Sequence, residues 1–233
     1  MATHIVNNAQ KAVPAERAFG DLSPAVADAL EQEAITTTYP TGAVLFTEGQ
    51  TARGVFIVRR GRVKLCICGS DGRTLILRMV DAGWPMGLAA VVSGRPYEAT
   101  AETLEPSELS FLRHNDLLRL MRAHGELALW VTQHISLDYS ATCREIRDLF
   151  LSDSASEKFA RLLVGWLDHN AEARNPSQVK LALTHEEIGQ MIGTSRETVS
   201  RLFAGFKKQH LIQQNGSTLV IPNRVALESL ILA

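Results

Sequence analysis

The sequence has few cysteines and no long apolar run, and each shortage excludes a class of protein. Its 233 residues include three cysteines, Cys66, Cys68 and Cys143. This set provides neither a disulfide framework nor the paired C-x-x-C knuckles of a structural metal site. The longest apolar runs, such as Leu88–Val92, have about five residues, whereas a membrane-spanning helix needs roughly 20. The N-terminus lacks the charged and apolar segments of a signal peptide. We therefore expect a cytoplasmic protein without a membrane partner.

The chain also has almost no net charge: the formal value at pH 7 is −1. This argues against a protein that coats nucleic acid without regard to sequence. The charge is nevertheless uneven along the chain. Residues 195–210 carry four basic side chains, Arg196, Arg201, Lys207 and Lys208, against the single acidic residue Glu197. Such a cluster is most often a solvated face, so its meaning depends on its structural context.

The N-terminal half has the texture of a β domain. Residues 1–18 are polar without a sustained period and are predicted to be a tail, and a short helical pattern at Leu22, Val26 and Leu30 follows. Beyond it, glycines separate short runs rich in β-branched and apolar residues, such as VFIV, RVKLCIC and TLILRMV. Short strands between glycine turns are typical of a sandwich or barrel. We expect this β domain to cover residues 19–115.

A long helix is predicted after the β domain. Residues 114–151 contain one glycine, Gly125, and no proline, which indicates a short helix, a break near the glycine and a long helix. One set of side chains recurs at spacings of 4, 4, 3, 4 and 3: Val131, Ile135, Tyr139, Thr142, Ile146 and Leu149. A second face, Leu127, Trp130, His134 and Leu137, can pack on the β domain. The spacing of the first set, from Val131 to Leu149, is typical of a coiled-coil seam. We therefore expect a dimerisation helix over residues 116–151; the alternative is a core helix packed within one chain.

The C-terminal part, residues 152–233, is predicted to form a winged helix-turn-helix. It contains three capping boxes, in which Ser or Thr is followed three residues later by Glu. They are Ser154 with Glu157, Thr184 with Glu187, and Thr194 with Glu197. The last two start short helices joined by Gly193, where we expect a positive φ. Downstream, Asn215-Gly216 marks a hairpin that would form the wing.

The second helix of this pair has two chemically distinct faces. Val199, Leu202, Phe203 and Phe206 lie at i, i+3, i+4 and i+7 and form the buried face. The opposite face carries Arg196, Glu197, Ser200 and Arg201. Arginine can donate two bonds to guanine, glutamate can accept from cytosine, and serine can do either. We therefore predict that these four residues read bases in the major groove. The alternative, a solvated helix with an i, i+4 ion pair, leaves the glycine turn and its capping boxes unexplained.

Residues around this face are predicted to contact the DNA backbone. They are Thr184, Thr194, Ser195, Lys207 and Lys208. Such contacts add affinity and salt dependence but carry no sequence information.

With these segments in this order, the chain resembles the CRP/FNR family of bacterial transcription regulators. The resemblance covers about residue 20 to residue 222 and is carried by YPTGAVLFTEGQTARGVFIVRRGRVKL, the long helix and EIGQMIGTSRETVSRLF. It implies an α+β fold with three parts. These are an N-terminal double-stranded β-helix (jelly-roll, cyclic-nucleotide-binding-like) sensor domain, a long dimerisation helix and a C-terminal winged helix-turn-helix. It also implies a homodimer that is not an enzyme, binds near-palindromic double-stranded DNA and works with RNA polymerase.

The resemblance also indicates which bases are read. Arg196, Glu197 and Arg201 match the R-E-x-x-x-R set of the cyclic-AMP receptor branch. Glu197, Ser200 and Arg201 match the E-x-x-S-R set of the fumarate-nitrate regulator branch. Both sets resemble readers of a T-G-A core. For a recognition helix over residues 195–209 we therefore expect half-sites that contain TGA, about one helical turn apart.

The sensor domain departs from the pattern of the cyclic-AMP binders, which carry a Gly-Glu pair and an Arg-Ser pair. Gly87 matches the glycine, but Leu88 replaces the glutamate, and Tyr97 and Glu98 replace Arg-Ser. Glu98 would repel a cyclic phosphate, and Arg95 is the nearby residue that could take over the phosphate contact. We therefore expect that this domain does not bind cyclic AMP in the usual way.

The sequence gives fewer indications of effectors other than cyclic AMP. Thr142 lies where family members contact effector from the long helix, so Cys143 is either a redox or ligand contact or a packing residue. Cys66 and Cys68 are either an oxidisable pair or two small core residues. The four-cysteine set of the iron–sulfur branch is missing, and no histidine stands out as a haem ligand. No cofactor or metal is predicted; the effector is an unidentified small molecule, or none is needed.

A competing hypothesis is a stand-alone effector-binding or enzymatic protein whose C-terminal domain serves only for dimerisation or interaction. The predicted base-reading face argues against it. The sequence also offers no nucleophile–base set, no phosphate-cradling glycine loop and no metal-ligand spacing.

Overall fold

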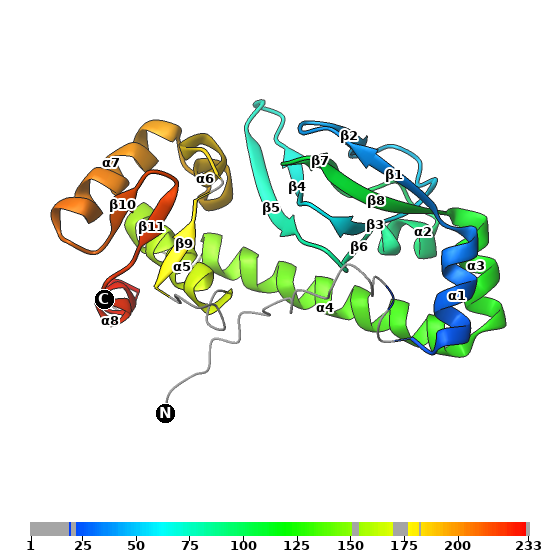
Figure 1. The fold of residues 1–233 in the computed structure, drawn as a ribbon. Helices are drawn as coiled ribbons and strands as arrows, with labels where there is room; N and C mark the ends of the chain where they lie inside the picture. Colours follow the sequence, from blue (N-terminus) through cyan, green and yellow to red (C-terminus); the bar gives the residue numbers. More distant parts are fainter. Residues whose placement is uncertain (1–18, 20–21, 151–153, 170–176, 182, 232–233) are drawn as a thin grey trace. The chain divides into compact units, whose positions relative to one another are not determined.

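The computed structural model describes residues 19, 22–150, 154–169, 177–181 and 183–231 (Figure 1). The chain divides into two compact units, one ending at Thr142 and the other beginning at Cys143. Each unit has its own hydrophobic core. Among the described helices, none has the length and apolarity needed to cross a membrane.

The first unit is built on two four-stranded antiparallel sheets (Figure 1). One sheet has the order β1 (Ile35–Tyr39), β8 (Ser107–Arg113), β3 (Gly54–Arg60) and β6 (Pro85–Met86). The other has the order β2 (Val44–Phe46), β7 (Thr100–Thr103), β4 (Val63–Cys68) and β5 (Thr74–Val80). Because most neighbouring strands are far apart in sequence, the chain winds between the two sheets. The predicted double-stranded β-helix is confirmed.

The β3 strand supplies the centre of this unit's core. Val55, Ile57 and Val58 are at most 2% exposed, because the helices α2 (Leu88–Ser93) and α3 (His114–Ala123) pack against this strand. The helix α1 (Pro24–Glu33) packs in turn on α3 and β8. Burying each of these aliphatic side chains contributes roughly 1.5–3 kcal/mol. The unbroken apolar run VFIV therefore marks a strand that is covered on both faces.

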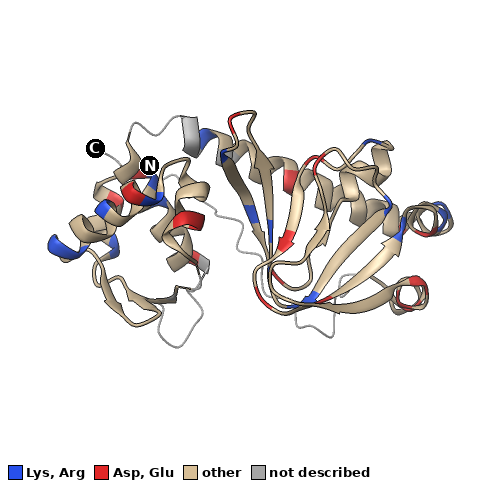
Figure 2. Ribbon diagram, turned by 90° about the horizontal axis from the view of Figure 1, so that it is seen from above, with Lys and Arg blue, Asp and Glu red and all other residues tan. Residues whose placement is uncertain are grey.

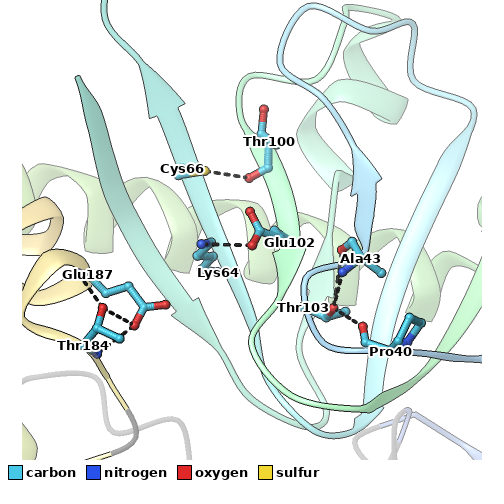
Figure 3. Close-up of polar contacts among 9 residues, drawn as sticks. All are labelled: Pro40, Ala43, Lys64, Cys66, Thr100, Glu102, Thr103, Thr184 and Glu187. Atoms are coloured by element: carbon cyan, nitrogen blue, oxygen red, sulfur yellow. Dashed lines mark hydrogen bonds and ion pairs between the residues drawn. The ribbon is translucent and has the colours of Figure 1, made fainter. Parts of the chain in front are cut away.

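Charged residues of both signs are interspersed over this unit (Figure 2), and half-buried and buried polar side chains in it have partners. Lys64 on β4 pairs with Glu102 on β7 at 3.1 Å (Figure 3). Thr103 is 1% exposed, yet its hydroxyl donates to the Pro40 carbonyl at 2.6 Å and accepts from the Ala43 amide at 2.9 Å. These bonds offset the cost of burying a hydroxyl.

The long helix α4 (Gly125–Phe150) is fixed to the β unit through its N-terminal half. Leu127 and Trp130 are at most 6% exposed in the core of that unit. Farther along, the Asp138 carboxylate accepts hydrogen bonds from Arg78 and from Trp84 Nε1, the latter at 3.1 Å. The Arg78 guanidinium also lies 4.4 Å from the centre of the Trp84 ring. This polar cluster ties α4 to β5.

The structure corrects part of the predicted dimer seam. Val131 is 1% exposed and belongs to the core of the β unit, and Ile135 packs against that core. These two residues face inward because the first turns of α4 cover the β-roll. Tyr139 and Ile146 are 72% and 52% exposed, and Thr142 is exposed as well. The Leu149 side chain lies outside the described residues. On the second predicted face, Leu137 is 38% exposed.

The second unit combines helices with a three-stranded sheet in the order β10-β11-β9. Its elements are α5 (Ala155–His169), β9 (Gln178–Lys180), α6 (His185–Ile192), α7 (Arg196–Lys208), β10 (Gln213–Asn215), β11 (Thr218–Val220) and α8 (Arg224–Ser229). The predicted hairpin at Asn215-Gly216 joins β10 to β11. Phe159 on α5 packs against Phe203 and Phe206 on α7, with 5.0 Å between ring centres. This contact fixes α7 on the core.

Candidate nucleic-acid interface

The two helices α6 and α7 form a helix-turn-helix whose geometry is set by local hydrogen bonds. At the start of α6, the Thr184 hydroxyl accepts from the Glu187 amide at 3.2 Å, and the Glu187 carboxylate accepts from the Thr184 amide at 2.8 Å (Figure 3). This is the predicted capping box. Gly193 ends α6 with φ +67°, a conformation that other residues adopt at a cost. The turn between α6 and α7 is therefore short.

The predicted capping box at the start of α7 is wrong by one residue. Ser195, not Thr194, is the N-cap, and its hydroxyl accepts from the Thr198 amide at 3.2 Å. The α7 helix accordingly begins at Arg196, so Glu197 lies in its first turn. Hydrogen bonds from its own backbone N–H and from the Ser195 hydroxyl lower the pKa of the Glu197 carboxyl. Glu197 is thus a hydrogen-bond acceptor at neutral pH.

The two faces of α7 divide as the spacing predicts. Val199, Phe203 and Phe206 are at most 3% exposed in the core of the second unit. The four predicted base-reading residues are all exposed: Arg196, Glu197, Ser200 and Arg201. They come from the first two turns of the helix, next to the turn that joins it to α6. The arrangement brings two guanidinium donors, one carboxylate acceptor and one hydroxyl onto a single surface.

Basic residues lie at both ends of α7 (Figure 2). At the C-terminal end, Lys207 and Lys208 are exposed, and Lys207 Nζ donates to the Gln214 side chain on β10 at 2.7 Å. The hydroxyls of Thr184 and Ser195 serve as helix caps, and Thr194 is half-buried. A basic helix end tied to the hairpin provides positive charge where phosphates would be bound.

Sequence reasoning missed one residue of this surface, His185, the first residue of α6. Its ring stacks on Phe203 with 4.5 Å between ring centres and 20° between planes. Its Nδ1 lies 2.9 Å from the Ser200 hydroxyl oxygen. Partial burial, followed by the positive charges of Lys207 and Arg196, lowers the pKa of His185. The one signal in the sequence was a histidine directly after an N-cap, which has no fixed meaning by itself.

In the β unit, the residues aligned with an effector pocket separate into two groups. Gly87, Leu88 and Tyr97 lie together inside: Gly87 has φ +86°, and a Cβ on it would lie 2.7 Å from the Tyr97 ring. Leu88 and Tyr97 are at most 3% exposed. Arg95 and Glu98, by contrast, are exposed, as are Thr142 and Cys143 on α4.

Tyr97 is integrated into the core of the β-roll. Its ring stacks on Phe46 with 4.0 Å between centres. Its hydroxyl donates to the Gly54 carbonyl at 2.6 Å and accepts from the Gly54 amide at 3.2 Å. Burial raises the pKa of Tyr97. The side chain therefore fills space in the core and holds the backbone at Gly54 in place.

The three cysteines occupy different environments. Cys66 is buried, its Sγ lies 3.7 Å from the Thr100 carbonyl (Figure 3), and burial raises the pKa of its thiol. Cys68 is exposed, so the prediction of two core cysteines is wrong for this residue, which lies at the end of β4. Cys143 is exposed on α4. Among the described residues, no group of three or more potential metal ligands is found.

A β-roll followed by a winged helix-turn-helix defines the class of two-domain, DNA-binding transcription regulators. Residues 36–124 match the cyclic nucleotide-binding domain family, and residues 157–230 match the Crp-like helix-turn-helix domain family. The chain belongs to the CRP/FNR family, whose members are transcription regulators and not enzymes.

Relatives of this chain include global transcription regulators. The chain is 27% identical over 184 residues to the cAMP-activated global transcriptional regulator CRP of Haemophilus influenzae, covering 78% of this chain and 82% of that one. It is 26% identical over 197 residues to the global nitrogen regulator of Synechocystis, covering 83% and 87%. The fold is similar to that of FixK2 from Bradyrhizobium japonicum, with a TM-score of 0.75, 23% identity, and 86% and 98% of the two chains covered.

Proposed function

We propose that this regulator acts as a homodimer and reads near-palindromic DNA with TGA-containing half-sites through Arg196, Glu197, Ser200 and Arg201. The observation that carries the proposal is the face of α7 opposite its buried residues. All four side chains are exposed there, in the first two turns of a helix whose start and turn are fixed by caps. Recognition helices use these early positions to reach base edges.

Each of the four residues has a defined chemical role on a base pair. Arg196 and Arg201 each offer two parallel donors, which suit the O6 and N7 acceptors of guanine. Glu197, ionised at neutral pH, can accept from the N4 amino group of cytosine. Replacing Arg196 by alanine should therefore cost about 1–3 kcal/mol of discrimination at one base position.

The DNA backbone contacts assigned to Thr184, Thr194, Ser195, Lys207 and Lys208 supply affinity. Lys207 and Lys208 are exposed at the end of α7 that is linked to the hairpin. Neutralising either lysine removes one phosphate contact from each subunit of the dimer. It is therefore expected to weaken binding to all sequences alike and to reduce the salt slope by about two. As a transcription regulator, the dimer would act together with RNA polymerase.

The dimer is proposed to form along an outward face of α4 that differs from the predicted seam. Six exposed side chains recur at spacings of 3, 4, 3, 4 and 3: Leu129, Thr132, Ser136, Tyr139, Cys143 and Ile146. Three of them, Leu129, Tyr139 and Ile146, are large and apolar, with exposed fractions of 59%, 72% and 52%. This spacing fits a two-helix coiled coil between copies.

Substitution at Ile146 tests the dimer. Ile146→Glu would bury a charge in each copy and is expected to raise the dimer dissociation constant about a hundredfold, measured by sedimentation equilibrium. Gln133→Glu places the same charge on an exposed α4 position outside this face and should leave the dimer intact. A dimer that tolerates Ile146→Glu would contradict this face.

The sensor domain is proposed not to bind cyclic AMP in the usual way. The support is that Tyr97 and Leu88, which the sequence comparison with the family pattern places at the phosphate and ribose contacts, are both buried, and that the Tyr97 ring stacks on Phe46. The control signal would then be another small molecule or the abundance of the regulator itself. The CRP relatives are described as cAMP-activated, so cyclic AMP is the ligand that the experiment must include.

The test is selection of DNA from a random library by the purified full-length protein, first without ligand and then with cyclic AMP. Enrichment of a TGA-containing palindrome without ligand would support both the site and an already competent dimer. Enrichment only with cyclic AMP would support the site and overturn the proposal for the sensor domain. Enrichment of unrelated sequences would overturn the assignment of the base-reading residues.

A further inference from the structure

The Ser200 hydroxyl, one of the four base-reading groups, already has two partners within the protein. It donates to the Arg196 carbonyl one turn earlier on α7, at 3.0 Å. It also lies 2.9 Å from His185 Nδ1 at the start of α6. The second partner comes from the other helix of the motif, 15 residues away in sequence.

His185 is held in place independently of Ser200. Its ring lies on Phe203 at 4.5 Å, nearly parallel to it, and Phe203 packs in turn on Phe159. The charged groups near the ring are Arg196 and Lys207, both on α7. The imidazole is thus a fixed neighbour of the hydroxyl, because the core of the domain positions it.

The number of hydrogens decides what Ser200 can present to DNA. A serine hydroxyl has one hydrogen to donate and two lone pairs that can accept. The Arg196 carbonyl can only accept a hydrogen bond. When His185 Nδ1 is protonated it acts as a donor, and the Ser200 hydroxyl then donates its hydrogen to this carbonyl. When Nδ1 is bare, it competes with the carbonyl for the same hydrogen. In every tautomer and protonation state, the hydrogen is used inside the protein and at least one lone pair remains.

We propose that His185, together with the Arg196 carbonyl, determines specificity by fixing Ser200 as a hydrogen-bond acceptor toward the major groove. An acceptor at this position selects bases that present an amino group there, namely cytosine N4 or adenine N6. It disfavours guanine and thymine, which present acceptors. His185 acts through Ser200 and is therefore a positioning residue. This inference rests on the proposed base-reading role of Ser200.

The experiment compares base-preference profiles of the full-length protein at every half-site position. The variants are Ser200→Ala, His185→Phe and the double variant His185→Phe/Ser200→Ala. His185→Phe keeps a ring on Phe203 but removes the nitrogens, so the hydroxyl loses one of its two internal partners. The Arg196 carbonyl remains, and the less constrained hydroxyl can then turn its hydrogen toward a DNA acceptor. We expect one position at which Ser200→Ala weakens a preference for C or A, and at which His185→Phe lowers it about three- to tenfold.

The double variant distinguishes a positioning role from direct contact. If His185 acts through Ser200, the double variant has the profile of Ser200→Ala. A further change in the double variant would mean that His185 contacts DNA itself and would overturn the inference. An unchanged profile for His185→Phe, beside a changed one for Ser200→Ala, would overturn it as well.

Controls separate this result from misfolding and from failure of the proposed function. His210→Asn removes another exposed histidine at a position with φ 58°, which asparagine tolerates; its profile should equal that of the wild type. If His185→Phe fails to fold by circular dichroism, His185→Leu replaces it as the variant without ring nitrogens. If the wild-type protein shows no base preference at all, the proposed function itself is overturned. If Ser200→Ala changes the profile but His185→Phe does not, only the role of His185 is overturned.

Discussion

At the scale of single residues, Gly87 and Tyr97 show how a glycine and an aromatic ring pack together in the β-roll. Gly87 keeps a left-handed backbone, and the space beside it is occupied by the Tyr97 ring. That ring is anchored by its stacking on Phe46 and by two hydrogen bonds to Gly54. The glycine of the family pattern therefore serves packing of an aromatic side chain here.

A methyl group at Gly87 is expected to be costly for two reasons. Gly87→Ala would place Cβ 2.7 Å from the Tyr97 ring and hold alanine at φ +86°, costing about 2–4 kcal/mol of unfolding free energy. Gly72→Ala is the matched control, since it has φ +79° but nothing within 4 Å, and should cost about 1–2 kcal/mol. Urea unfolding measures both, and equal costs would contradict close packing of Tyr97.

His185 should make the second unit sensitive to acid. Because burial, Lys207 and Arg196 lower its pKa below the ordinary 6.5, the unfolded chain binds a proton more readily than the folded one. The free energy of unfolding should therefore be fully retained above about pH 6.5 and decrease as the pH falls toward the lowered pKa. In His185→Phe this contribution is absent, so the stability difference between wild type and variant should shrink as pH falls. A difference that is constant from pH 8 to pH 5 would contradict the lowered pKa.

At the scale of elements, the helix-turn-helix is fixed by caps that can be assigned to single hydroxyls. Thr184 caps α6, and Ser195 caps α7. Both caps lie beside the proposed base-reading face, so the angle between α6 and α7 depends on a few short hydrogen bonds and on Gly193. A change in any of them is expected to affect stability and DNA binding together.

The position of the α7 cap can be tested directly. Ser195→Ala removes the bond to the Thr198 amide and is expected to lower the free energy of unfolding by about 1 kcal/mol. Thr194→Ala, one residue earlier, should cost only a few tenths by comparison. The two variants differ by one position and are compared by thermal unfolding. If Thr194→Ala were the more damaging change, the helix would begin where the sequence pattern alone predicted.

At the scale of the whole molecule, the two units have separate cores. The core of the first runs from Phe19 to Val131 in sequence, and the core of the second from Phe159 to Leu227. The long helix α4 passes from one unit to the other. The β-roll and the helix-turn-helix domain therefore rest on separate cores, and we expect each of them to gain or lose stability independently.

Calorimetry of core variants should show this independence. Phe159→Ala empties a fully buried position in the second unit and should lower the stability of that unit by about 3–5 kcal/mol. Leu109→Ala, at a buried position on β8, should lower the stability of the first unit by about 2–5 kcal/mol. Each variant is expected to shift one thermal transition and leave the other in place. A single transition that moves as a whole in both variants would show that the units unfold together.

The sequence by itself determined the features that depend on residues close together in the chain. The glycine-separated strands, the long helix, the capping box at Thr184 and the two faces of α7 all follow from rules that act within one or two helical turns. The family resemblance followed from the order of these segments. For this reason the β-roll, the helix-turn-helix and the exposure of the four residues proposed to read bases were all predictable.

Only the tertiary structure decided which residues meet across elements. His185 pairs with Ser200 from another helix, Tyr97 bonds to Gly54 43 residues away, and Val131 faces the β-roll although its spacing fits a seam. A spacing pattern indicates that a face is apolar but not which partner covers it, because that choice depends on how whole elements pack. Of the two partners of the Ser200 hydroxyl, the Arg196 carbonyl is local to α7, whereas His185 is brought to it only by the packing of α6 on α7.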